Sequence, residues 1–137
     1  MQAGMAYRAV HRRSAPGVWW WRAAALAWML LMFWLSSRSD LPDPAQLPEW
    51  IPVDKVAHLF LFAVLAALLY LAGLRAPLAV LGAGLYGLSD EFHQMHVPGR
   101  SPELQDWMAD VVGAVVGVWL VHRLRRLATS TPPEPVE

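Results

Sequence analysis

The chain has 137 residues, of which 56% are hydrophobic and only 16% are charged, and its formal net charge is zero. Soluble domains usually carry about 25% charged residues, so this composition is short of the solvated surface that a soluble domain needs, and the zero net charge argues against a nucleic-acid partner. The absence of cysteine excludes disulfides, thiolate metal sites and a cysteine nucleophile.

The N-terminal part of the chain predicts a basic tail followed by a membrane helix. Residues 1–17 are polar and contain Arg8, Arg12 and Arg13, which is typical of a cytoplasmic tail. Residues 18–35 form an apolar run long enough to span a bilayer, which takes about 17–25 residues in a helix. A cleaved signal peptide is the competing interpretation, but the run is longer than a usual signal core, and we favour a retained helix.

A proline-rich segment separates this helix from the next one. Residues 36–53 contain four prolines and three acidic residues, so we expect an extended loop. The second helix is predicted over 54–74, with Asp54 as its N-cap. A tight turn follows, and Pro77 suits the first turn of a third helix over about 77–92.

The last helix is predicted from residue 106 or 107 to about 122, after a hinge that contains Pro98 and Gly99. Gly113 and Gly117 have the GxxxG spacing that lets helix backbones approach closely in membranes. We expect a disordered tail over 127–137, which leaves 18–126 as one four-helix transmembrane domain.

Loop charge predicts the orientation of this domain. An N-in arrangement places eight arginines on the cytoplasmic side and only three cations outside, so both termini are expected in the cytoplasm. The predicted fold class is therefore all-α, an integral-membrane four-helix bundle with N-in/C-in topology. This topology gathers ten polar side chains at the outer leaflet: Asp54, Lys55, His58, Asp90, Glu91, His93, Gln94, Arg100, Asp106 and Asp110.

Two interpretations of these polar residues stay open. Asp90 or Glu91 could be a general base with His58 or His93 as its partner, since titratable pairs in a shielded site can separate their pKa values. The same residues could instead cap helices and form ion pairs, because structural networks often resemble active sites. Our catalytic candidates are Asp90, Glu91 and His58. The candidates for ligand binding are Asp54, Lys55, His93, Gln94, Arg100, Asp106 and Asp110.

Arg100 and the histidines raise two further questions. Arg100 could hold a phosphate or carboxylate of an envelope lipid, or it could neutralise Asp106 or Asp110. The histidines and carboxylates are acceptable ligand types for zinc or manganese, but no helix carries a ligand pair such as HxxxH. We therefore predict no metal site and no cofactor.

Several short motifs resemble the VanZ-like family of membrane proteins. They are the Asp54-Lys55-x-x-His58 start of one helix, then Asp90-Glu91-x-x-Gln94, Pro98-Gly99-Arg100, and the segment from Asp106 to Gly113. The resemblance covers about residues 20–122 and implies a multi-pass fold. One position departs from the family pattern: Asp110 stands where the family usually has Asn.

The resemblance also implies a setting for the protein. The family takes its name from a protein linked to glycopeptide resistance, particularly to teicoplanin, which implies a role in the cell envelope. The arginine-rich, lysine-poor composition is typical of a GC-rich bacterial genome, so we expect a bacterial plasma-membrane protein in contact with membrane lipids. Its oligomeric state stays open.

Three functional classes are compatible with these residues. The first is a protein that binds an envelope lipid, a lipid-linked precursor or a glycopeptide-related ligand. The second is an integral-membrane hydrolase or transferase that acts on such a lipid. The third, a carrier, is disfavoured because the middles of the helices are apolar, whereas transporters place polar residues near the bilayer midplane.

Overall fold

The computed structural model describes residues 17–39 and 53–130, and these residues form four helices. They are α1 (Val18–Ser36), α2 (Val53–Leu71), α3 (Ala76–Gln94) and α4 (Leu104–Thr129). The described part of the chain contains no strand, which confirms the predicted all-α class.

Several helix boundaries differ from the predictions. Helix α2 ends at Leu71 and not at Leu74, and α4 begins at Leu104 and not at residue 106 or 107. Helix α2 begins at Val53, so Asp54 lies in its first turn and is not its N-cap, although its charge still complements the helix dipole there. Helix α3 continues to Gln94, so the polar residues from Asp90 to Gln94 all lie within this helix. Helix α4 extends to Thr129, so the tail predicted from residue 127 begins inside a helix. The predictions for 1–16, 40–52 and 131–137 lie outside the described residues.

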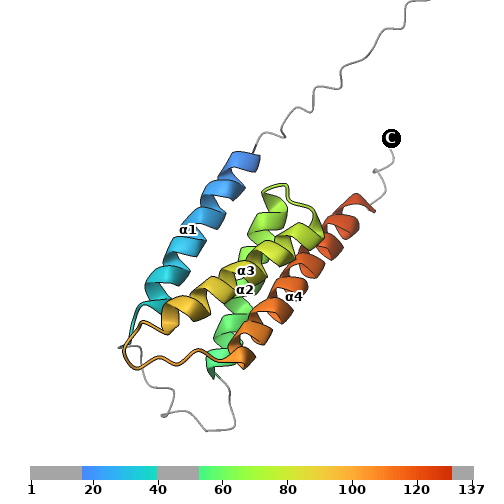
Figure 1. Ribbon diagram of the computed structural model, residues 1–137. Coiled ribbons are helices and arrows are strands. Elements are labelled where there is room, and N and C mark those ends of the chain that lie inside the picture. The colour runs from blue at the N-terminus through green and yellow to red at the C-terminus, as the bar shows by residue number, and fades with distance from the viewer. Residues whose placement is uncertain (1–16, 40–52, 131–137) are drawn as a thin grey trace, which may run out of the picture.

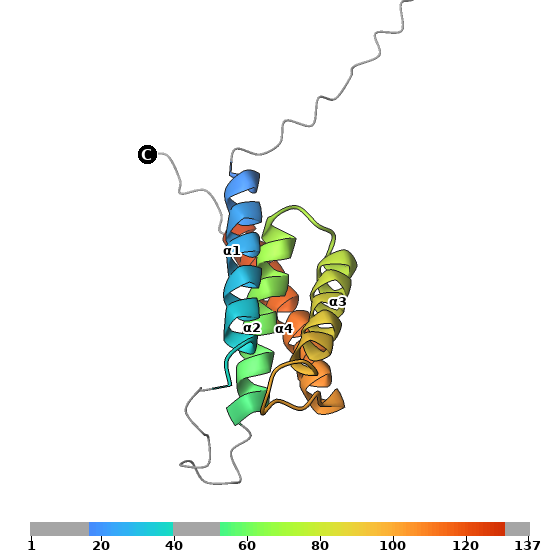
Figure 2. The same cartoon turned by 60° about the vertical axis from the view of Figure 1, so that its left-hand side comes forward.

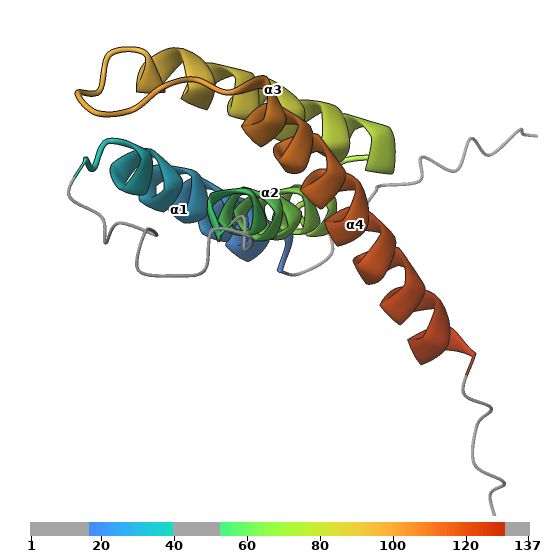
Figure 3. The same ribbon diagram turned by 90° about the horizontal axis from the view of Figure 1, so that it is seen from below.

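The helices alternate in direction, so that all four run along one bundle (Figure 1). α1 and α3 end, and α2 and α4 begin, at the same end of the bundle, which we call the polar end. Helix α2 lies in the centre, with the other three helices around it (Figures 2 and 3). Helices α2 and α4 make the most extensive contact.

Two glycines of α4 explain the close approach of α4 to α2. A Cβ atom built on Gly113 would collide with the backbone of Leu59, and one on Gly117 would collide with the backbone of Ala63. No side chain can yield at these positions because the obstacle is main chain. The GxxxG prediction is confirmed as a helix-packing face.

The core is small and consists mainly of small side chains. Its buried members are Met32, Phe62, Leu65, Ala66, Ala79, Ala83, Ala114 and Val118. Helix α1 is additionally tied to its neighbours by two hydrogen bonds to main-chain oxygens, from Trp28 Nε1 to Leu61 O (3.0 Å) and from Tyr86 Oη to Met29 O (2.6 Å). Such bonds satisfy polar atoms that lipid cannot satisfy.

The outside of the bundle is apolar. Three of the described helices, α1, α2 and α4, are long and apolar enough to cross a membrane. Large side chains such as Trp34, Phe60 and Trp119 are more than half exposed, and lipid tails are the solvent that accommodates them. Helix α3 has the same length as α1 and α2 but carries polar residues in its last turns.

Candidate functional site

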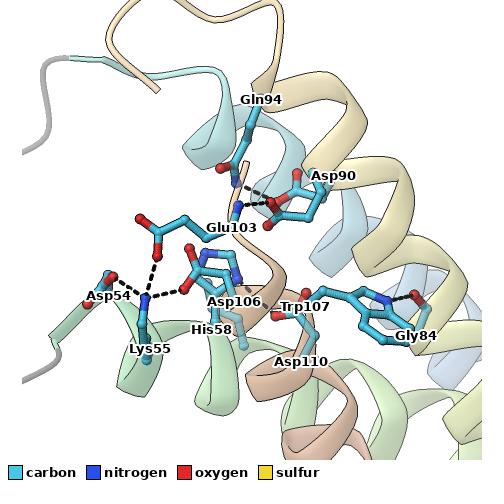
Figure 4. Close-up of polar contacts among 12 residues, drawn as sticks. Asp54, Lys55, His58, Gly84, Asp90, Gln94, Glu103, Asp106, Trp107 and Asp110 are labelled. Carbon is cyan, nitrogen blue, oxygen red and sulfur yellow. Dashed lines mark hydrogen bonds and ion pairs between the residues drawn. The ribbon is translucent and has the colours of Figure 1, made fainter. Parts of the chain in front are cut away.

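The polar end brings together residues that are far apart in the sequence. The first turns of α2, the last turns of α3 and the first turns of α4 meet there, and their side chains converge (Figure 4). Asp90, Glu91, Gln94, Asp106 and Asp110 are all buried, with exposed fractions of 8% or less. Buried polar groups need hydrogen-bond partners, so these five residues must find partners among the side chains and backbone groups of the polar end.

Lys55 is the cation that three carboxylates of this end share. Its Nζ atom lies 2.9 Å from carboxylate oxygens of Asp54, Glu103 and Asp106, so the ammonium group donates to three carboxylates (Figure 4). The pair with Asp106 is the most shielded, because the side chain of Asp106 is only 9% exposed whereas those of Asp54 and Glu103 are about half exposed. Lys55 therefore links the start of α2 to the start of α4.

His58 and Asp110 form the deepest polar contact. His58 Nδ1 lies 2.8 Å from Asp110 Oδ1, and Asp110 is completely buried. An ionised carboxylate only accepts hydrogen bonds, so an ionised Asp110 assigns the hydrogen to Nδ1 and leaves His58 Nε2 as an acceptor. Asp110 thus holds the ring of His58 in one tautomer and one orientation.

Two further bonds involve the last turns of α3, one within the helix and one to the start of α4. Gln94 Nε2 donates to Asp90 Oδ2 (3.0 Å) one helical turn away, and the backbone N–H of Glu103 donates to Glu91 Oε2 (2.8 Å). The second bond satisfies a donor at the start of α4 that no side-chain cap serves. Among the described residues, Glu91 Oε1 and Asp110 Oδ2 are buried carboxylate oxygens without a hydrogen-bond partner.

Helix α3 is held at a fixed distance from α4. Trp107 Nε1 donates to Gly84 O at 3.0 Å. A Cβ atom on Gly87 would lie 2.5 Å from Asp110 Oδ2, so only glycine allows the Asp110 carboxylate to sit against α3. Gly87 therefore determines where the Asp110 carboxylate lies, and the bond from Trp107 to Gly84 determines how close α3 lies to α4.

A pocket of about 580 Å³ opens beside these contacts, between α1, α2, α3 and the turn after α3. Its polar walls include Asp54, His58, Asp90, Gln94 and Arg100. Its apolar floor consists of Met32, Leu35, Leu61 and Phe62. Gly99 adopts φ +80°, a left-handed conformation that favours glycine, and the turn it makes leads directly into Arg100. The pocket combines charged walls with an apolar floor.

The predicted site residues divide into those that meet and those that do not. Asp54, Lys55 and Asp106 form one cluster, and His58, Glu91 and Asp110 form another. Asp90 and Gln94 lie in the pocket wall.

His93 and Arg100 have other neighbours. His93 Nε2 lies 2.9 Å from the hydroxyl of Ser37, the residue that follows α1. Arg100 does not neutralise Asp106 or Asp110, which pair with Lys55 and His58; it donates Nε and Nη2 to the carbonyl oxygen of Arg38, both at 3.3 Å.

Glu103 is the site residue that sequence reasoning missed. It supplies one carboxylate to Lys55 and one backbone N–H to Glu91. Its position three residues before Asp106 is a usable signal, because the N-cap residue lies at the same helix end as the side chains of the first turn. Ser36, Arg38 and Ser39 also line the pocket, and no pattern in the sequence marked them.

The bundle, its lipid-facing surface and its buried polar end define a multi-pass α-helical membrane protein with a polar site at one end. A family model described as VanZ/LLP1 matches residues 13–125. The chain therefore belongs to the VanZ/LLP1 family, which confirms the resemblance carried by its motifs. Comparisons with curated proteins and with solved structures gave no match.

Proposed function

We propose that this protein binds an amphiphilic ligand of the cell envelope, a lipid-linked or glycopeptide-related molecule, in the pocket at its polar end. The observation that supports this proposal is the pocket itself, which is lined by Arg100, His58 and Asp90 together with apolar side chains. Its volume of about 580 Å³ lies in the range of small-molecule sites, about 300–1,000 Å³.

The guanidinium group of Arg100 is the reason to expect a phosphate or carboxylate group on this ligand. A guanidinium group is planar and offers two parallel donors, which matches either anion. Its contacts with a main-chain oxygen at 3.3 Å are long, so an anionic group would replace them at little cost. Asp54 and Asp90 in the same walls can accept hydrogen bonds from hydroxyl or amino groups.

The proposal also includes the side of the membrane on which the polar end lies. We place the polar end at the outer face of a bacterial plasma membrane, because Arg75, Arg123, Arg125 and Arg126 all lie toward the opposite end. Envelope lipids and glycopeptide antibiotics act on that outer face. A role in teicoplanin resistance is the physiological expectation.

The binding proposal can be tested with the purified full-length chain in lipid nanodiscs. The probe is a polyprenyl phosphate, which carries the anion and the apolar chain together. We expect Arg100→Gln to weaken binding by about tenfold or more, as loss of a charge-assisted pair of about 1.5–3 kcal/mol implies. Ser101→Ala, one residue away on the exposed surface, is the matched control and should bind like the parent chain. Equal binding by Arg100→Gln and the parent would refute the proposal.

A hydrolase or transferase acting on an envelope lipid is the second candidate, and one observation favours it. His58 lines the pocket and is oriented by a fully buried carboxylate. In this mechanism His58 Nε2 takes a proton from the attacking water or alcohol, and Asp110 stabilises the resulting imidazolium. Asp90 shares the pocket wall and stays a candidate base. Glu91 does not line the pocket and is already engaged by Glu103, so it is the weakest of the three catalytic candidates.

The two candidates predict different behaviour of one variant. Under the enzyme mechanism, His58→Gln abolishes release of the lipid product and leaves polyprenyl-phosphate binding within a factor of a few. Under the binding proposal the parent chain releases no product, and Arg100→Gln reduces affinity for the polyprenyl phosphate while abundance stays normal. If Asp90→Asn, His58→Ala and Arg100→Ala all fail to accumulate in cells, the polar end is structural and both candidates fail.

A further inference from the structure

Three helices each contribute one potential metal ligand to a single point below the polar end. His58 comes from α2, Glu91 from α3 and Asp110 from α4, and one ligand-type atom of each lies within 4.8 Å of the others. Glu91 is 7% exposed and Asp110 is fully buried, so the two carboxylates are shielded from water. This convergence is a property of the folded bundle, since the three residues share no helix.

A second observation concerns the hydrogen bonding of the two carboxylates in this cluster. Glu91 Oε1 and Asp110 Oδ2 are buried without a hydrogen-bond partner among the described residues, and they belong to the two carboxylates of this cluster. Buried polar atoms in native proteins nearly always have a partner, and an exception calls for an ion, a water molecule or a functional role. Two unpaired carboxylate oxygens in one cluster leave two buried atoms that can accept a further ligand.

The neighbouring acidic cluster provides a comparison within the same protein. Asp54, Glu103 and Asp106 meet the same geometric condition, but the ammonium group of Lys55 lies 2.9 Å from each of them. In that cluster the positive charge of Lys55 already balances part of the negative charge of the carboxylates. The His58–Glu91–Asp110 cluster has no comparable lysine or arginine among its hydrogen-bond and ion-pair partners in the described residues, and its only basic member is His58.

We propose that His58, Glu91 and Asp110 bind one divalent transition-metal cation, of the Zn²⁺ or Mn²⁺ type. A neutral imidazole and two carboxylates carry a charge of −2 together, which a divalent ion balances. Coordination by His58 Nδ1, the nitrogen beside Asp110, moves the imidazole hydrogen to Nε2 and replaces the hydrogen bond of the metal-free state. Nitrogen and oxygen ligands without thiolates suit these two ions. Three protein ligands leave a coordination position open for water or a ligand, as in catalytic zinc sites.

The geometry needs only a small adjustment. Zinc bonds of about 2.0–2.1 Å in a tetrahedral site separate neighbouring ligand atoms by about 3.3 Å. The observed limit of 4.8 Å therefore closes with side-chain movements of about an ångström, without displacement of the helices. The inference goes beyond ligand binding in the pocket and does not depend on which ligand the pocket holds.

The test uses the untagged full-length chain in detergent, stripped with a chelator and then dialysed against Zn²⁺ or Mn²⁺ in separate samples. Metal content is measured by mass spectrometry, and thermal unfolding is followed as metal is added. We expect one metal ion per chain and a melting temperature that rises with metal concentration, because a ligand of the native state stabilises it by mass action.

The variants distinguish this site from adventitious binding. Asp110→Asn removes one ligand charge while keeping an oxygen for His58, and Glu91→Gln does the same on α3; each should weaken metal affinity by at least about tenfold. Glu103→Gln is the matched control, since it removes an equal charge at the same end but keeps the backbone N–H that Glu91 accepts. His96→Gln tests an exposed histidine of the same end.

Each outcome decides the proposal. Metal binding that is lost in Asp110→Asn and Glu91→Gln and kept in Glu103→Gln and His96→Gln supports it. Binding that disappears in His96→Gln and survives in Asp110→Asn assigns the metal to the surface and overturns it. A parent chain that takes up neither ion and shows no shift in melting temperature overturns it as well. Because the polyprenyl-phosphate assay uses Arg100→Gln, failure of the pocket proposal is distinguishable from failure of this one.

Discussion

Lys55 shows how one cation can organise several acidic residues. Three carboxylates approach its ammonium group at 2.9 Å, and they come from α2, from the residue before α4 and from α4 itself. Exposed ion pairs contribute little, about 0–1 kcal/mol each, so the pairs with Asp54 and Glu103 are weak individually. The pair with the buried Asp106 carries most of the stabilisation because water does not screen it as effectively.

Replacing this cation should therefore destabilise the polar end. We expect Lys55→Met to lower the free energy of unfolding by about 1.5–3 kcal/mol, since Asp106 would lose its charged donor and three carboxylates would repel one another. Thermal unfolding in detergent measures the effect. In the Lys55→Met background, Asp106→Asn should restore part of the loss. No recovery in the double variant would contradict the assignment of Asp106 as the main partner.

Asp110 occupies the position where the family pattern usually has asparagine, and the structure gives it a partner in His58. In metal-free buffer, Asp110→Asn should change the free energy of unfolding by less than about 1 kcal/mol, because the amide oxygen can still accept from His58 and a buried charge is removed. Asp110→Ala should cost about 1–3 kcal/mol, because it leaves His58 without its partner. Chemical or thermal unfolding of the two variants side by side checks this. Equal losses in both variants would contradict the argument.

At the scale of the helices, the packing of α4 on α2 depends on two glycines, which have no side chain beyond hydrogen. Gly113 and Gly117 place the α4 backbone directly against the backbone of α2 at Leu59 and Ala63. In a bilayer, lipid tails solvate apolar side chains as well as another helix does, so close van der Waals packing drives helix association. The GxxxG pair therefore does more for this bundle than the larger residues on its surface.

A single methyl group tests this packing. Gly113→Ala and Gly117→Ala should each destabilise the bundle by about 1–3 kcal/mol or more, because an overpacked contact with main chain cannot relax through a rotamer change. Gly82→Ala is the control, since its Cβ would meet only Leu69 Cδ1 at an ordinary 3.6 Å. Melting temperature and cellular abundance measure both. A loss in Gly82→Ala as large as that in Gly113→Ala would show that the effect belongs to glycine in general and not to this contact.

The number and order of the helices could be predicted from sequence, but their ends could not be placed to the residue. Apolar run length and proline positions located all four helices. The polar last turns of α3, ending at Gln94, and the basic end of α4, reaching Thr129, lack the apolar periodicity that marks a helix. Their hydrogen bonds continue because the preceding turns already fix the backbone, and propagation costs less than nucleation.

At the scale of the whole molecule, the four helices alternate in direction, so half of the helix ends lie at the polar end of the bundle and half at the opposite end (Figure 1). The polar end holds the carboxylate clusters and the pocket. The opposite end holds the turn after α2, with Arg75, and the basic last turns of α4. This asymmetry of charge is the basis for the predicted orientation in the membrane.

The orientation can be measured with single cysteines, since the chain has none of its own. Ser101→Cys and Ser130→Cys are exposed, conservative and at opposite ends of the bundle. We expect a membrane-impermeant maleimide to label Ser101→Cys in intact cells and Ser130→Cys only after the membrane is permeabilised. The reverse pattern would place the polar end in the cytoplasm and would overturn the proposed outer-leaflet site.

Sequence alone determined the membrane class, the helix count and the packing role of the GxxxG pair, because these follow from local composition and from spacing along one chain segment. It also indicated that the polar residues gather at one end, since up-and-down topology leaves no other arrangement. Only the tertiary structure decided which of them pair: Lys55 with Asp106 and Glu103, and His58 with Asp110. These partners come from different segments of the chain, and their contact depends on the depth and rotation of each helix. The backbone contacts at Gly113 and Gly117 and the contact of Gly87 with the Asp110 side chain set that depth and rotation, and spacing along one segment does not specify which side chains then meet.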